Sequence, residues 1–232
     1  LLLTVGADGL NTYLGGTVDN VIINAALGFP LGTGRIIAHN VYTYSTGNLL
    51  AYMNGANYTH IIFDNLQAPY SDVSNPAKYL TYSALNNDIY VAYAFKLTVI
   101  DSNGNPIQGV TVTIQNEQNT QNYGFNYTTG ADNSGPLTTD ANGEISQIVL
   151  IHYKHYNSTR TGYWKLCDTT VDYGKSTITI SKPGYQTKTL KLTMDRKREE
   201  IEVLEKEVPI YIGKGKVLVN IDPKNSQNNI LV

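Results

Sequence analysis

Short apolar strands separated by turn residues run along this 232-residue chain, and this pattern constrains the fold more than any other feature. No stretch has apolar residues at the i, i+3, i+4, i+7 spacing that a long amphipathic helix requires. Strand-forming runs bounded by Gly, Asn and Pro recur instead. The clearest runs are Asn20–Asn24, Arg35–Val41, His60–Asn65, Asp88–Tyr93 and Phe95–Asp101. The sequence therefore predicts an all-β fold.

Three of the N-terminal runs share a pattern of two adjacent Ile residues followed by polar residues or Asn. It stands at Ile22–Asn24, Ile36–Asn40 and Ile61–Asn65. This recurrence resembles the end of a right-handed parallel β-helix, the fold of pectate lyases, phage tailspikes and many surface adhesins, in which Asn often sits at the turns between rungs. An antiparallel sandwich with Asn-rich loops is the alternative. Residues 1–94 are expected to form this β-rich N-terminal domain.

From Phe95 the chain carries three turn blocks between alternating strands. They are Asp101–Pro106, Thr138–Glu144 and Lys182–Tyr185, each with a Gly that supplies a positive φ or a tight turn. Their order resembles the carboxypeptidase regulatory-like family, an Ig-type, transthyretin-like β-sandwich. The resemblance implies a seven-strand sandwich with an accessory role and no catalytic residues to transfer. It predicts a sandwich domain over residues 95–207, with unusually long connections at 115–137 and 154–175.

The C-terminal region is set apart by its charge. Ten charged residues lie between Asp195 and Glu207, although only 16% of the whole chain is charged. This segment is expected to be the closing strand of the sandwich, with its Glu and Lys side chains forming a solvated face that discourages edge pairing. Residues 208–232 are expected to form a hairpin across Gly213–Gly215 and to act as an assembly segment.

Composition excludes several functions. The formal net charge is −2, so the chain is not basic enough to bind nucleic acid without sequence preference. No run of 18 apolar residues occurs, so no membrane span is expected. A single cysteine, Cys167, cannot form an internal disulfide or a thiolate zinc site.

Candidate metal and catalytic groups are weak. The loop that starts at Asp101 lacks the Gly and the bidentate Glu of an EF-hand, and a calcium role for Asp140, Asn142 and Glu144 is only a minor alternative to a turn. His39 and His60 could stack on one face of the rungs, but polar surface or turn roles are favoured over metal binding. The acids of residues 1–95 are scattered, so we expect no catalytic residue, no metal site and no cofactor.

The aromatic residues of the 154–175 connection are the best ligand-binding candidates. Arg160, Tyr163 and Trp164 combine amphipathic rings with a cation, which suits protein or glycan recognition. The alternative is that Trp164 fills the sandwich core. Sequons stand at Asn57, Asn126 and Asn157, and their number is no more than chance predicts.

These observations together predict a non-enzymatic structural or adhesive module of an extracellular surface or appendage protein. It would act by self-assembly or docking through strand edges, as a homo-oligomer or a polymer of itself. A viral tail-fibre or spike component, located on the virion surface, is one alternative. A carbohydrate-binding accessory module of a secreted enzyme is another, with a glycan or a host surface as its ligand.

Overall fold

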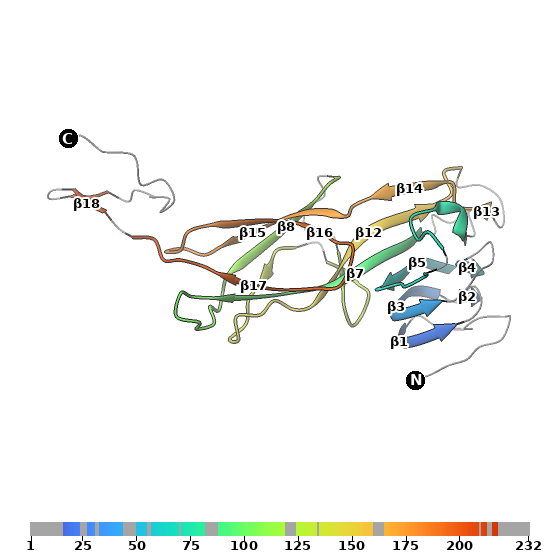
Figure 1. Ribbon diagram of the computed structural model, residues 1–232, viewed down its shortest axis with the longest axis horizontal. Coiled ribbons are helices and arrows are strands. Elements are labelled where there is room, and N and C mark those ends of the chain that lie inside the picture. The colour runs from blue at the N-terminus through green and yellow to red at the C-terminus, as the bar shows by residue number, and fades with distance from the viewer. Residues whose placement is uncertain are drawn as a thin grey trace.

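The computed structural model describes residues 16–23, 27–30, 33–43, 50–54, 57–69, 71–81, 88–118, 124–133, 135–159, 165–208, 210–212 and 215–217. Within these ranges the all-β prediction is confirmed, since the only helical element is a single 3₁₀ turn, η1 (Pro76–Lys78). The protein is elongated, with a coil of parallel strands at one end and a β-sandwich beside it (Figure 1). No helix in the described ranges is long and apolar enough to cross a membrane.

Two parallel sheets build the coil. The strands of the first are β1 (Gly16–Ile23), β3 (Thr33–Thr43), β5 (Asn57–Asp64) and the start of β7 (Asp88–Ile100). The strands of the second are β2 (Leu27–Pro30), β4 (Ala51–Asn54) and β6 (Tyr79–Thr81), with the short β13 (Lys165–Leu166) antiparallel to β6. Successive strands alternate between the two sheets, so the chain winds in rungs, as in a β-helix, and does not form an antiparallel sandwich here.

The strand register confirms the predicted alignment of the Ile pairs at Ile36 and Ile61, and it contradicts the predicted alignment of the first rung. Ile36 pairs with Ile61, and Ile61 pairs with Ile89. The first rung was aligned wrongly, because Gly16 pairs with Ile36 and Asn20, not Asn24, falls in line with the later asparagines. The offset between paired strands is 20 residues from β1 to β3, 25 from β3 to β5 and 28 from β5 to β7, so no fixed period reveals it.

Adjacent Ile residues are explained by a sheet that is covered on both faces. Ile36 and Ile61 point into the coil and belong to the main core. Their neighbours Ile37 and Ile62 point to the other face, where they pack with Tyr90, Phe125, Val149 and Ile151. Parallel sheets buried on both faces carry such continuous apolar runs.

Strand β7 joins the coil to the sandwich. Its first residues pair with β5, and Phe95–Ile100 pair in parallel with β17 (Arg198–Val203). Along its other side runs the antiparallel β12 (Ile148–Tyr156). The separate strands expected at Asp88–Tyr93 and Phe95–Asp101 are therefore one strand, and the domain boundary expected at residue 94 falls inside it.

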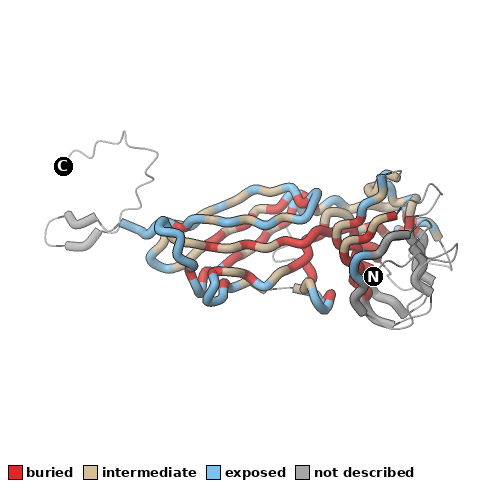
Figure 2. The backbone as a smooth tube through the Cα atoms, turned by 60° about the horizontal axis from the view of Figure 1, so that its bottom comes forward, coloured by how far each residue is buried: buried red, intermediate tan, exposed pale blue. Residues whose placement is uncertain are grey.

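The sandwich packs the β7 sheet against a second, antiparallel sheet. The β7 sheet also contains β9 (Gly124–Asn126), β10 (Asp132–Asn133) and β14 (Thr169–Asp172). The second sheet is ordered β11 (Leu137–Thr138), β8 (Thr111–Asn116), β15 (Lys175–Ser181), β16 (Lys188–Thr193). Alternate residues such as Leu97, Val112 and Ile178 are fully buried between the sheets, and Figure 2 shows this buried interior continuing into the coil.

The three turn blocks lie at turns, as predicted. Position 143 depends most on glycine, because its φ is +73° and a Cβ on Gly143 would lie 2.4 Å from the carbonyl oxygen of Val99. Strands β8 and β12 begin several residues after the first two turns, because Ile107 and Ile145 first donate backbone hydrogen bonds to the carbonyl oxygens of Val99 and Leu97 of β7. Ile145 is buried with them.

At the C-terminal end the expected hairpin is present. It consists of β18 (Ile210–Ile212) and β19 (Gly215–Val217), which pair antiparallel. Within the described ranges these two strands pair only with each other, and they lie beyond the tip of the sandwich (Figure 1). The part of the expected strand that follows Val217 lies outside the described residues.

Candidate functional site: the junction between the coil and the sandwich

The predicted ligand-binding residues Arg160, Tyr163 and Trp164 lie outside the described residues, so their role stays a prediction. The residues that flank this segment are held to each other. The Asn157 side-chain amide donates to the Leu166 carbonyl at 2.8 Å, and Lys165 Nζ donates to Thr159 Oγ1 at 3.2 Å.

The sequon asparagines differ in their surroundings. Asn157 is 6% exposed, and its amide nitrogen, where a glycan would attach, is used by the bond to Leu166. Asn126 caps a turn by accepting hydrogen bonds from the backbone of Thr128 and Thr129. Asn57 opens β5. Glycosylation at Asn157 would require this part of the fold to open.

A ladder of asparagines runs along one edge of the coil. Asn20, Asn40 and Asn65 all have positive φ values, between 51° and 59°, a conformation that Asn tolerates better than most residues. Asn65 Nδ2 donates to Asn40 Oδ1 at 3.0 Å, and Asn40 Nδ2 donates to Asp19 Oδ1 at 2.9 Å. The side-chain amides of Asn65 and Asn40 therefore fix the register of their rungs against the previous rung.

A buried histidine lies beside this ladder and connects the two parts of the protein. His39 of β3 is 2% exposed; its Nδ1 lies 2.7 Å from Asp64 Oδ2 of β5, and its Nε2 lies 2.9 Å from the carbonyl oxygen of Tyr127, which follows β9. The His39 ring also stacks on the Tyr127 ring with centroids 4.0 Å apart. The two ring nitrogens of His39 thus contact two different partners, one in the coil and one in the sandwich.

The carboxylate of this pair is poorly compensated without the histidine. Asp64 is 1% exposed, and its second oxygen, Oδ1, has no hydrogen-bond partner among the described residues. A buried carboxylate is costly unless it is paired. His39 therefore stabilises two neighbouring rungs and the sandwich loop at the same time.

A second histidine connects the two parts from the sandwich side. His155 of β12 is fully buried and donates from Nε2 to the carbonyl of Val73, in the coil loop before η1, at 3.1 Å. Its ring stacks on Tyr79 of β6, whose hydroxyl donates to the same carbonyl at 2.9 Å. Burial lowers the pKa of His155 to about 4 and raises the pKa of Tyr79. The imidazole is therefore neutral at physiological pH and the phenol keeps its proton.

Sequence reasoning placed the histidines of the coil wrongly. In the register of β3 and β5, His60 is the partner of Arg35 and His39 is the partner of Asp64, so the two histidines do not occupy paired positions. The expected polar surface role of His39 is also wrong, because its environment is buried. The signal was present in the two aligned runs Ile36–Asn40 and Ile61–Asn65, whose fourth positions are His39 and Asp64.

The carboxylates of the turn blocks organise the turns themselves. Asp101 Oδ1 accepts from the backbone of Asn103 and Asn105, and Asp140 Oδ1 accepts from Asn142 and Glu144. The hydrogen bonds from Asn105 lower the pKa of Asp101. Among the described residues no three His, Cys, Asp or Glu side chains lie together as a metal site would require.

The distribution of charged side chains on β17 differs from the one expected for the closing strand. Ile201 is 69% exposed and Val203 39% exposed on the outer face, whereas Glu202 points inward and pairs with Lys188 of β16. The register explains this, because Glu202 lies opposite Val99, whose side chain is in the core. Glu200 and Glu202 therefore lie on the inner side of this edge, whereas Ile201 and Val203 face outward together with Glu199.

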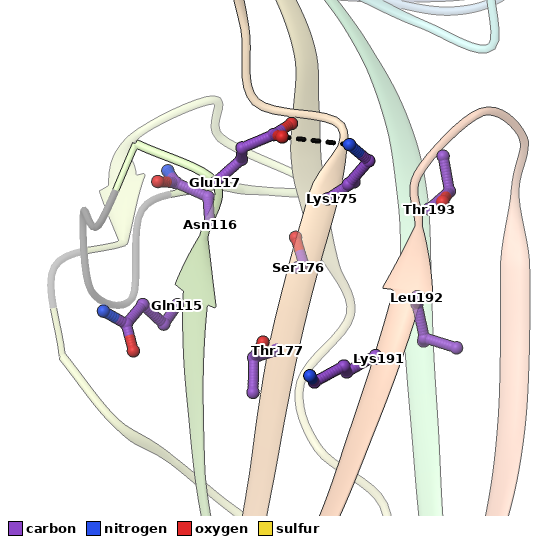
Figure 3. Close-up of a pocket in the computed structure, with 9 residues that line it drawn as sticks. All are labelled: Gln115, Asn116, Glu117, Lys175, Ser176, Thr177, Lys191, Leu192 and Thr193. Atoms are coloured by element: carbon purple, nitrogen blue, oxygen red, sulfur yellow. Dashed lines mark hydrogen bonds and ion pairs between the residues drawn. The ribbon is translucent and has the colours of Figure 1, made fainter.

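A polar groove of about 360 Å³ lies at one end of the second sheet (Figure 3). Glu117 and Lys175 form an ion pair across it at 3.0 Å, and Lys191 and Thr193 line its other side. None of its nine lining residues is aromatic. It has the chemistry for a small polar group but not the stacking platform that typifies sugar binding.

Comparisons with known proteins assign no family. No family model and no curated relative matches the chain. Among solved structures, 3-chlorocatechol 1,2-dioxygenase from Rhodococcus opacus is 15% identical, with a TM-score of 0.31 over 50% of this chain and 60% of that one. The minor pilin of Streptococcus agalactiae is 17% identical, with a TM-score of 0.33 over 56% and 54%. The Bacillus anthracis TIE protein is 10% identical, with a TM-score of 0.27 over 51% and 17%.

The chain thus spans less than two thirds of each of these proteins, and the matches cover about half of it. Similarity at this level assigns neither fold nor function, and an enzyme stands beside a pilin among the matches. What the chain does has to be argued from its own residues.

Proposed function

We propose that this chain is a non-enzymatic structural module of an extracellular surface or appendage protein, in which coil and sandwich act as one rigid unit. The observation that carries the proposal is β7, which pairs with β5 of the coil and with β12 and β17 of the sandwich. A strand shared in this way leaves no linker at which the two parts could bend. The sandwich is proposed to be of the carboxypeptidase regulatory-like type, supported by the three turn blocks.

Polar contacts at the junction support the rigid arrangement. His39 bonds to Tyr127 from the coil side, and His155 bonds to Val73 from the sandwich side, so the junction is held at two separate places. Buried and satisfied polar contacts have strict geometry and specify one arrangement of the parts they join. An enzyme would instead need an accessible cluster of acids, bases or metal ligands.

The two ends of the module suit joining to neighbours. Within the described ranges no strand pairs with the outer edge of β1 or β2, and the β18–β19 hairpin pairs with nothing else. Unpaired strand edges are templates for another strand, and a two-stranded hairpin alone is marginally stable in water. We therefore propose that copies of this chain associate through these ends.

Light scattering coupled to size exclusion tests the association. We expect masses that rise from 25.5 kDa to whole-number multiples of it as the protein concentration increases. Tyr211→Pro, which removes a backbone donor from β18, should shift the chain toward monomer, whereas Asn103→Ala in an exposed turn should not. A monomer at every concentration would count against the proposal.

A further inference from the structure

The parallel pairing of β7 with β17 has a mechanical consequence. Six residues of β17, Arg198–Val203, pair in register with Phe95–Ile100 of β7. Strand β7 enters this ladder from the coil, and β17 leaves it at the opposite end of the molecule, toward β18 (Figure 1). The chain thus enters and leaves the sandwich through two neighbouring strands that run in the same direction.

Tension between the coil and the C-terminal exit acts on these strands in opposite directions along their length. It pulls β7 toward the coil and β17 toward the tip. The hydrogen bonds of a parallel ladder lie across the strands, so they are loaded together and not one after another. We propose that the β7–β17 ladder is a tension clamp, and that the module's further function is to resist pulling along its long axis.

Both strands are anchored as a clamp requires. Strand β7 is paired on its other side with β12, from Phe95 with Ile148 to Ile89 with His155. Its inward side chains Leu97 and Val99 are fully buried. The strand cannot slide toward the coil without disrupting the core of the sandwich.

Strand β17 is held although it lies at a sheet edge. Arg198 Nε donates to the Thr193 carbonyl at 2.8 Å, and Glu202 pairs with Lys188, so both ends of β17 are tied to β16 in the opposite sheet. Beyond β17, Gln186 N donates to the Glu205 carbonyl at 2.8 Å and Glu207 N donates to the Gly184 carbonyl at 3.0 Å. These bonds extend the resistance past the ladder itself.

This inference deepens the proposed function and rests on it for its biological meaning, since only a module within a surface or appendage structure would be pulled. The coil is fixed to the sandwich by His39 and His155, so force applied to the coil reaches the start of β7. The clamp itself depends only on topology and can be measured on a single copy.

Single-molecule pulling in two directions tests the clamp on the full chain. In the first geometry, a handle is attached through Ala77→Cys, an exposed position of η1, and through a C-terminal tag, which loads the ladder in shear. In the second, Asn103→Cys replaces Ala77→Cys, which peels the ladder open from the end where β7 and β17 both finish. Cys167 is 2% exposed and does not compete for the handle.

We expect the shear geometry to rupture at a force at least about twofold higher than the peeling geometry, because the ladder bonds share the load. Release of about 400 Å of chain identifies unfolding of the sandwich. Both variants should show the parent's urea midpoint, and Ser102→Cys is a second peeling handle if Asn103→Cys does not. Equal forces, or a higher force in the peeling geometry, would overturn the clamp, while light scattering still decides the proposed association separately.

Discussion

The coil and the sandwich are held in register by different kinds of contact. In the sandwich, the turns are ordered by local contacts. Asp101 and Asp140 accept hydrogen bonds from backbone N–H groups two to four residues further along the chain. In the coil, the ordering contacts join residues 21 to 88 positions apart, as in the Asn40–Asp19, His39–Asp64 and His39–Tyr127 pairs. Local turn chemistry thus specifies one half, and long-range buried polar contacts specify the other.

The largest effect should come from breaking the buried pair of the coil. His39→Ala leaves the Asp64 carboxylate buried without its partner, which typically costs about 3–5 kcal/mol. Urea unfolding measures the loss. The double variant His39→Ala with Asp64→Ala should recover part of it, because the uncompensated charge is gone. A loss below about 1 kcal/mol for His39→Ala, the value of a surface pair, would contradict the role assigned to this contact.

The junction histidine His155 should make stability depend on pH. Its folded pKa of about 4 lies below the ordinary value of about 6.5, so the unfolded chain binds more protons between these values. Stability is therefore fully present above pH 6.5 and is lost as pH falls toward 4, by about 3 kcal/mol from this group.

Urea midpoints from pH 7.5 to 4 measure this dependence. The control is His155→Gln, which keeps a donor for the Val73 carbonyl but does not titrate. We expect a weaker loss of stability with acid in this variant. Identical pH profiles for the two proteins would show that His155 is not the group responsible.

In the sandwich the matched experiment is a pair of turn glycines. Gly143→Ala brings a Cβ to 2.4 Å from the Val99 carbonyl at a positive φ, and we expect a loss of about 2–4 kcal/mol. Gly104 also has a positive φ, but nothing lies within 4 Å of the Cβ that Ala would add. Gly104→Ala should therefore lower the free energy of unfolding by only about 1 kcal/mol. Thermal melts of the two variants give the difference. Equal losses would mean that the close approach of Gly143 to β7 does not matter.

The smallest effect tests the asparagine ladder. Asn40→Gly keeps the positive φ but removes the bonds to Asp19 and Asn65, and it should cost about 1 kcal/mol. Asn40→Ala should cost about 1 kcal/mol more, because Ala also disfavours this φ. If Asn40→Gly is as stable as the parent protein, the ladder specifies the register of the rungs but does not stabilise the fold.

What the sequence could predict follows the same division. The all-β fold, the three turn blocks and the repeated Ile pairs were readable because each is a local pattern. The alignment of the first rung was missed because its strand, Gly16–Ile23, has no Ile pair at the matching position and the rungs differ in length. The single strand β7 was divided in two because the residue pattern changes at Phe95 although no turn residue interrupts it.

The junction could not be predicted because it depends on register. His39 meets Asp64 only when strands 25 residues apart are correctly paired, and Tyr127 joins them only when the sandwich loop packs on the coil. The inward direction of Glu202 depends in the same way on the parallel partner chosen by β17. Pairing between residues this far apart in the sequence produces no recognisable pattern within either segment.

Hydrogen exchange at increasing urea tests most directly whether the coil and the sandwich form one unit. Amides of β3 and β5 in the coil should open in the same cooperative reaction as amides of β8 and β15 in the sandwich, with one urea midpoint, because β7 belongs to both. Exchange of β3 and β5 at a lower urea concentration, with β8 and β15 still protected, would contradict the account.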